Sequence, residues 1–115
     1  MSDDVYPHAS HQLAHKRREL APETEKAFMA FSAQVFADGA LSAKMKQVVA
    51  VAVAHVTQCP YCIAGHTKAA LRAGATEQEL MEAIWVAAEM RAGGAFAHSN
   101  ISLTVMDQVN AKPQP

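Results

Sequence analysis

Alanine is the commonest residue in this chain, and its abundance constrains the fold more than any other feature. It supplies 24 of the 58 hydrophobic residues in a chain of 115, while aromatic residues make up only 6%. Alanine is the best helix former, and its small side chain lets helices approach one another closely. We therefore predict an all-α fold with thin cores and further apolar surface buried between subunits.

Length and charge limit the classes of partner. A chain of 115 residues is about one domain long. Ten basic and eleven acidic residues give a formal charge of −1, with no basic stripe of the kind that binds nucleic acid. Residues 1–8 lack a signal-peptide layout, and the longest apolar run, 48–56, is too short to span a bilayer. We expect a cytoplasmic protein with no nucleic-acid or membrane partner.

Changes in polarity and the positions of proline and glycine divide the chain into a polar N-terminal arm at 1–20, a helical domain at 21–110 and a tail at 111–115. Pro22 suits a first helical position, Ser42 an N-cap, and Gly74 a left-handed helix end. Thr76 to Glu79 forms a capping box, and Gly93-Gly94 is expected to break the helix that follows. We expect the buried face of that helix to consist of Leu80, Ile84, Trp85 and Ala88. The predicted domain has five to six helices, with segments near residues 22–38, 43–57, 60–73, 77–92 and 95–109.

The segment 43–57 permits a second interpretation. Val49, Val51 and Val53 alternate with other residues, a β-branched pattern that also suits a buried strand. A strand leading into Cys-x-x-Cys would be the layout of thioredoxin. That fold needs several strands, and the C-terminal half offers only 101–106 as one. Segment length and alanine content favour the helix.

The two cysteines and one histidine lie within eight residues, in the order Cys59-Pro60-Tyr61-Cys62 and then His66. If a helix begins at Pro60, Cys62 and His66 share one face, and Cys59 lies at the helix start, where backbone N–H groups stabilise a thiolate. Either sulfur could attack a peroxide and become a sulfenic acid, which the other would close to a disulfide. A reductant would then reopen this bond by thiol exchange.

Other roles for these residues are a buried apolar cysteine pair and a zinc site. Two thiolates and an imidazole make three zinc ligands, and the candidates for a fourth are His55 and His98, neither of which belongs to a second ligand pair. Covalent haem attachment would require histidine where Ile63 stands. We therefore expect no metal and no cofactor.

The motif as a whole resembles a known family. The run AVAVAHVTQCPYCIAGHTKAA at residues 50–70, with GATEQELMEA at 74–83, is similar to the AhpD-like (alkylhydroperoxidase D-like) branch of the carboxymuconolactone decarboxylase superfamily. The resemblance covers roughly residues 20–107. It implies an all-α fold that carries the cysteine pair at the start of a central helix and assembles as a trimer or hexamer.

The resemblance also implies an activity, that of a thiol peroxidase acting on hydrogen or organic hydroperoxides. It makes Cys62 the peroxidatic cysteine, Cys59 its disulfide partner and His66 a member of the proton relay. The implied reductant is a lipoyl group or another dithiol. Because the decarboxylases of the superfamily generally lack this cysteine pair, decarboxylation is disfavoured.

One residue departs from the family pattern. A glutamate usually lies twelve positions before the first cysteine, and Gln47 stands there instead. An amide can orient a histidine but cannot carry a carboxylate's charge or accept its proton. His55 could take over in the relay. The altered relay motivates an alternative function, a redox-sensing or zinc-binding protein, or a general disulfide reductase, with little peroxidase turnover.

Overall fold

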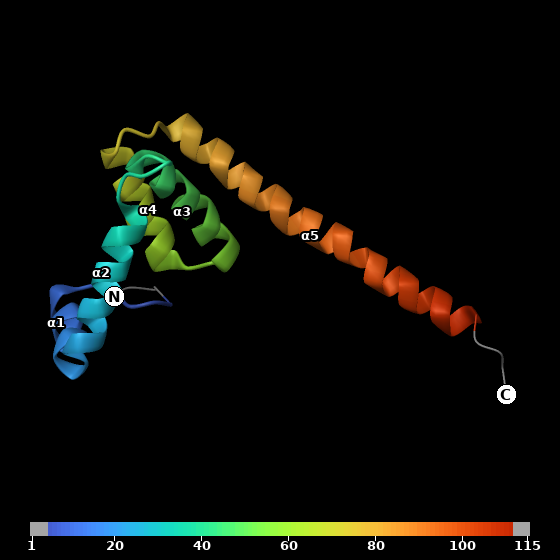
Figure 1. Cartoon of the computed structure of the whole chain (residues 1–115), viewed down its shortest axis with the longest axis horizontal. Coiled ribbons are helices and arrows are strands. Elements are labelled where there is room, and N and C mark those ends of the chain that lie inside the picture. Colours follow the sequence, from blue (N-terminus) through green and yellow to red (C-terminus); the bar gives the residue numbers. More distant parts are fainter. Residues whose placement is uncertain (1–4, 112–115) are drawn as a thin grey trace. The chain divides into compact units, whose positions relative to one another are not determined.

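The computed structural model describes residues 5–111, and helices are its only regular secondary structure in this range. This confirms the all-α prediction and excludes the strand interpretation of residues 49–53. The chain forms five helices in this range, which Figure 1 shows coloured in chain order. They are α1 (His11–Leu20), α2 (Pro22–Phe36), α3 (Ala43–Thr57), α4 (Pro60–Arg72) and α5 (Glu77–Ala111).

The chain divides into two compact units between Lys46 and Gln47. The first unit contains α1, α2 and the first turn of α3. The second contains the rest of α3 together with α4 and α5. Every residue of the predicted redox site therefore belongs to the second unit.

The predicted N-terminal arm contains a helix. Ser10 caps α1, because its side chain accepts a hydrogen bond from the backbone N–H of Leu13 at 3.2 Å. Polar side chains support the same helix, with His15 Nε2 lying 2.9 Å from Glu19 Oε1 one turn later. None of its residues is buried, which agrees with the polar sequence. The part of the predicted arm before residue 5, and the part of the predicted tail after residue 111, lie outside the described residues.

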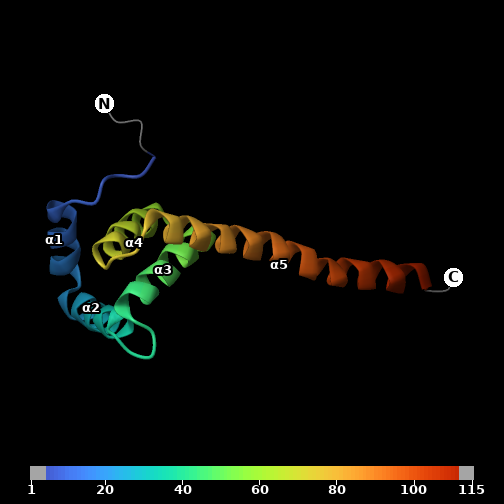
Figure 2. The same cartoon turned by 90° about the horizontal axis from the view of Figure 1, so that it is seen from above.

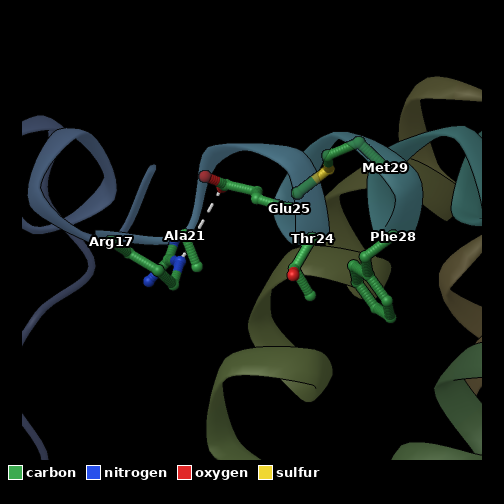
Figure 3. Close-up of a pocket in the computed structure, with 6 residues that line it drawn as sticks. All are labelled: Arg17, Ala21, Thr24, Glu25, Phe28 and Met29. Carbon is green, nitrogen blue, oxygen red and sulfur yellow. Dashed lines mark ion pairs between the residues drawn. The ribbon is translucent and has the colours of Figure 1, made fainter. Parts of the chain in front are cut away.

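Residues of α1 and α2 line a cavity of about 450 Å³ in the first unit. Figure 3 shows the Arg17 guanidinium beside the Glu25 carboxylate at this cavity, with Nε and Oε1 3.8 Å apart. The remaining lining is Ala21, Thr24, Phe28 and Met29. Neither cysteine lines this cavity, so the cavity is not part of the candidate redox site.

Small residues form the core of the second unit, as the alanine content predicts. Val51 and Ala70 have no exposed surface, and Ala75 and Leu80 are at most 6% exposed. The turn before α5 keeps its predicted chemistry, since Gly74 has φ +100° and the Thr76 hydroxyl accepts the Glu79 N–H at 3.0 Å. The turn residues predicted from the sequence thus lie beside buried core residues, Ala75 and Leu80.

Helix α5 continues through Gly93-Gly94 as one helix of 35 residues, so the predicted break and the separate fifth segment are wrong. Glycine weakens a helix interior by about 1 kcal/mol relative to alanine, but it does not block the backbone. Helix-compatible residues on both sides outweigh that cost. Figures 1 and 2 both show α5 extending well beyond α3 and α4. Even so, no helix within residues 5–111 is long and apolar enough to cross a membrane.

The buried face of α5 differs in part from the predicted one. Leu80 is buried and Ile84 packs against the core, as expected, and Ala87 is also buried. Trp85 and Ala88 were predicted on the same face, but both are exposed, Trp85 to 69%. Each of these follows a core position by one residue, and one residue turns a helix by about 100°. Trp85 is therefore a surface residue of this chain.

Candidate redox site

The connection between α3 and α4 positions the first cysteine. Helix α3 ends at Thr57, and Gln58 adopts a left-handed conformation with φ +58° that turns the chain. Cys59 is then extended, with φ −101° and ψ 104°, and serves as the N-cap of α4. Pro60 occupies the first helical position, where its missing N–H costs nothing. The sequence Gln-Cys-Pro therefore places one thiol at a helix N-terminus.

Cys59 and Cys62 interact across the first turn of α4. The backbone N–H of Cys62 donates a hydrogen bond to the Cys59 Sγ at 3.2 Å. Both thiols are free and half-buried. This confirms the predicted position of the pair at a helix start, and it makes the cysteine side chain itself the helix cap.

The pKa values of the two thiols are shifted in opposite directions. The Cys62 side chain donates a hydrogen bond that, with the backbone N–H groups of Cys62 and Tyr61, lowers the pKa of Cys59 despite partial desolvation. The same bond to Cys59, followed by burial and by the charge on Cys59, raises the pKa of Cys62. The environment at the start of α4 thus favours the thiolate more at Cys59 than at Cys62.

His66 is held by a residue of the neighbouring helix. Its Nδ1 lies 2.8 Å from the Oε1 of Gln47, a contact that joins α4 to α3 across 19 residues. The amide oxygen is an acceptor, so this hydrogen bond requires a hydrogen on Nδ1. His66 also follows Cys62 by one turn on the same face of α4. The contact with Gln47 therefore fixes the orientation of the imidazole ring.

The core explains why Gln47 meets His66. Val51 follows Gln47 by one turn on α3, and Ala70 follows His66 by one turn on α4. Val51 and Ala70 both belong to the fully buried cluster. Packing of this small pair fixes the register of the two helices, and the same register brings the amide to the ring.

The other two histidines considered from sequence have local backbone partners. His55 Nδ1 lies 2.8 Å from the Val51 carbonyl oxygen, and His98 Nδ1 lies 2.7 Å from that of Gly94. Within residues 5–111, no group of three or more His, Cys, Asp or Glu side chains is arranged to hold a metal ion. The structure thus brings Cys59 to Cys62 and His66 to Gln47, and residues 5–111 contain no ligand cluster for the zinc interpretation.

Two residues around the site went unnoticed in the sequence. Arg91 of α5 donates from Nη1 to the carbonyl oxygen of Val56 at 2.7 Å, which satisfies the C-terminal end of α3 beside the cysteine connection. Gln58 supplies the left-handed turn. The position of Gln58 directly after a predicted helix could have suggested its conformation, whereas no local signal links Arg91 to residue 56.

Comparison with known proteins identifies the family of this chain. The model of the carboxymuconolactone decarboxylase family matches residues 22–101, most of the chain and all four residues of the site. The chain belongs to the carboxymuconolactone decarboxylase family. It is 56% identical over 110 residues to uncharacterized protein 4 in the cox locus of Paracoccus denitrificans, covering 96% of this chain and 98% of that protein.

Solved structures agree with the family assignment. A protein from Methanobacterium thermoautotrophicum has a TM-score of 0.69 at 37% identity, covering 72% of this chain and 93% of its own. A carboxymuconolactone decarboxylase family protein from Legionella pneumophila, in its apo form, has a TM-score of 0.66 at 33% identity, covering 84% and 86%. The family thus accounts for the helical fold, and the cysteine pair must be interpreted from its own geometry.

Proposed function

We propose that this member of the family is a thiol-dependent peroxidase. It reduces hydrogen or organic hydroperoxides and stores the oxidising equivalents as a Cys59–Cys62 disulfide. His66 takes part in proton transfer, and a dithiol such as a lipoyl group restores the two thiols. The observation that carries this proposal is the bond from the Cys62 N–H to the Cys59 Sγ at the start of α4.

That bond supports the proposal because it places two thiols within one helical turn of each other. A thiolate is the reactive form of cysteine, and a helix N-terminus stabilises it. A sulfenic acid formed on one sulfur would have a second thiol beside it and would condense to a disulfide with loss of water. The chain could thus complete the oxidative half of the cycle by itself.

The decisive experiment measures hydroperoxide consumption by the full chain with a dithiol donor such as dihydrolipoamide. We expect turnover in the wild type, its loss in the Cys59→Ser/Cys62→Ser double variant, and retention in Ala88→Ser, an exposed control on α5. Peptide mapping after one equivalent of hydroperoxide should reveal a Cys59–Cys62 disulfide. Equal consumption by the wild type and the double variant would contradict the proposal.

A second candidate function is general disulfide reduction with little peroxidase turnover. Gln47 favours it, because the amide beside His66 carries no charge to stabilise an imidazolium during proton transfer. Reduction of a small disulfide such as cystamine by the dithiol form, without hydroperoxide consumption, would support this function. Stoichiometric zinc in protein purified without chelator, with neither reaction, would instead support a metal-binding role.

We also propose that copies of this chain associate through α5. Large apolar side chains recur along its C-terminal half and are exposed in a single chain, and their burial against another copy would be favourable. Phe96 is 81% exposed, Ile101 62% and Val109 61%. A second copy presenting the same helix would cover this surface, consistent with the trimer or hexamer that the resemblance implies.

A further inference from the structure

We propose that Arg91 forms an anion-binding subsite beside the cysteine pair, and that the pair acts on reactants that carry a carboxylate. This role rests on the function proposed above, and it names the chemical class of the molecules that reach Cys59 and Cys62. Two independent features support it. One is the set of contacts at the end of α3, and the other is the distribution of charge over α3 and α4.

The C-terminal end of α3 binds both Arg91 and Cys59. The last carbonyl groups of a helix have no partner inside it and point out of its C-terminal end. Arg91 Nη1 donates to the carbonyl oxygen of Val56 at 2.7 Å, and the backbone N–H of Cys59 donates to that of Ala54 at 3.2 Å. Both carbonyl groups belong to the last turn of α3. The guanidinium and the first cysteine therefore lie at the same end of this helix.

Packing of α5 brings Arg91 to this place. Leu80 and Ala87 of α5 are buried, and Ile84 packs against the core. Arg91 follows Ala87 by one turn, so it continues the side of α5 that faces the core. Glu89 lies two residues earlier, on a different side of the helix. The position of the Arg91 cation thus follows from the same packing that buries the apolar stripe.

The Arg91 guanidinium can bind a carboxylate while it holds the end of α3. A guanidinium has five N–H donors in a planar fork, and the Val56 carbonyl oxygen accepts from one of its nitrogens. Arg91 is exposed, so a reactant in solution can reach the remaining donors. Their spacing matches the two oxygens of a carboxylate. Such a contact would hold a reactant beside the half-buried thiols.

The helices on both sides of the cysteine connection carry only positive charge. The chain has eleven acidic residues, but none lies in α3 or α4, which contain Lys44, Lys46, Lys68 and Arg72. The first turn of α4 also lacks the acidic residue that often offsets the positive end of a helix dipole. The net charge of the whole chain is −1. This local excess of positive charge should attract anions to the cysteine pair.

The subsite can be tested without any peroxide, by comparing two alkylating reagents that differ in charge. The reduced full chain is treated with iodoacetate or with iodoacetamide, and the rate at each cysteine is measured by peptide mass spectrometry. Both reagents require the thiolate, so the ratio of their rates cancels any change in its population. We expect Arg91→Gln to lower the iodoacetate to iodoacetamide ratio about threefold at low salt, the effect of one charge at short range in water.

Matched variants separate the charge of Arg91 from its structural role. Arg91→Lys keeps the charge and should retain most of the ratio, whereas Arg72→Gln removes the same charge from the far end of α4 and should change it little. The difference should vanish in about 1 M sodium chloride, where the Debye length is about 3 Å. The wild type should also show a higher ratio when folded than in urea, a comparison that needs no variant. An unchanged ratio in folded Arg91→Gln, or equal ratios in folded and unfolded wild type, would overturn the subsite.

Turnover then shows which reactant carries the carboxylate. Dihydrolipoate is compared with dihydrolipoamide as reductant, and a fatty-acid hydroperoxide with its methyl ester as substrate. We expect a kcat/KM at least about threefold higher for the carboxylate in one of these pairs, lost in Arg91→Gln and kept in Arg91→Lys. Equal values in both pairs would overturn the subsite and leave the peroxidase intact. If no pair is turned over but alkylation depends on Arg91, the peroxidase proposal fails and the subsite stands.

Discussion

The Nδ1 of His66 lies 2.8 Å from the Oε1 of Gln47, and this contact connects the cysteine-bearing helix to the helix before it. The Gln47 amide can orient the ring by this hydrogen bond, and it carries no charge of its own. The contact exists because Val51 and Ala70, one turn beyond each partner, are completely buried against the same core. The orientation of His66 therefore depends on the packing of Val51 and Ala70.

Removal of the His66 imidazole should slow hydroperoxide consumption while leaving the protein folded. A general base in this position contributes about 100-fold or more to the rate, so we expect a loss of that order in His66→Ala. Steady-state hydroperoxide consumption measures it, and thermal unfolding monitors the fold. His15→Ala on α1, an exposed residue paired with Glu19, is the control. Equal turnover in both variants would remove His66 from the mechanism.

The reactivity of Cys59 should persist to lower pH than that of an ordinary thiol, whose pKa is about 8.5. A lowered pKa means that the thiolate survives as pH falls and is lost only below the shifted value. The pH profile of alkylation at Cys59 should therefore have its midpoint below that of the urea-unfolded chain. Cys62→Ala removes the main hydrogen-bond donor and should move the midpoint upward. A midpoint unchanged by unfolding would contradict the role of the helix start.

Enlargement of Ala70 should disturb both stability and the site. Its side chain has no exposed surface, so Ala70→Leu forces extra volume into a packed core, at a cost of about 1–3 kcal/mol in the free energy of unfolding. Urea denaturation followed by circular dichroism measures the change. Ala88→Leu places the same side chain on an exposed position of α5 and should leave stability within about 0.5 kcal/mol. Similar costs in the two variants would argue against the helix contact described above.

Gln58 and Gly74, the residues with left-handed backbone within residues 5–111, should respond oppositely to substitution. Gln58 has φ +58°, and glycine relieves the steric cost of this conformation, so we expect Gln58→Gly to stabilise the protein by about 0.5–1 kcal/mol. Gly74 has φ +100°, and Gly74→Ala should destabilise it by about 1 kcal/mol or more. Thermal melts of the two variants test the pair. Changes of the same sign would show that something other than backbone conformation dominates.

A charge on the exposed half of α5 should weaken self-association. Ile101 is 62% exposed, and burial of Glu at this position between copies would cost several kcal/mol unless it were paired. We expect the particle mass measured by analytical ultracentrifugation to fall towards that of a single chain in Ile101→Glu. Gln78→Glu adds the same charge near the start of α5 and should leave the mass unchanged. An unaltered assembly in Ile101→Glu would place the interface elsewhere.

Local signals predicted most of the helices because each one acts within a few residues. The Ser42 hydroxyl caps α3 by accepting the Met45 N–H at 3.1 Å, and Pro60 begins α4, as their sequence contexts indicate. The same reasoning failed at Gly93-Gly94, where two helix-weakening residues were read as a break. A helix can continue through residues of low helix propensity when the residues on both sides favour the helix. The prediction that Trp85 is buried is also wrong, because residue type alone does not tell which side of a helix faces the core.

The sequence by itself determined an all-helical chain, a cysteine pair at a helix start, and a histidine one turn beyond it, because capping, proline geometry and helical spacing are local. Tertiary structure decided which neighbour holds that histidine, since Gln47 reaches His66 only through the register that the buried Val51 and Ala70 impose. It also decided which apolar side chains of α5 are buried, such as Leu80, and which are exposed, such as Trp85. Register and burial depend on contacts between residues far apart in the chain, and no local pattern encodes them.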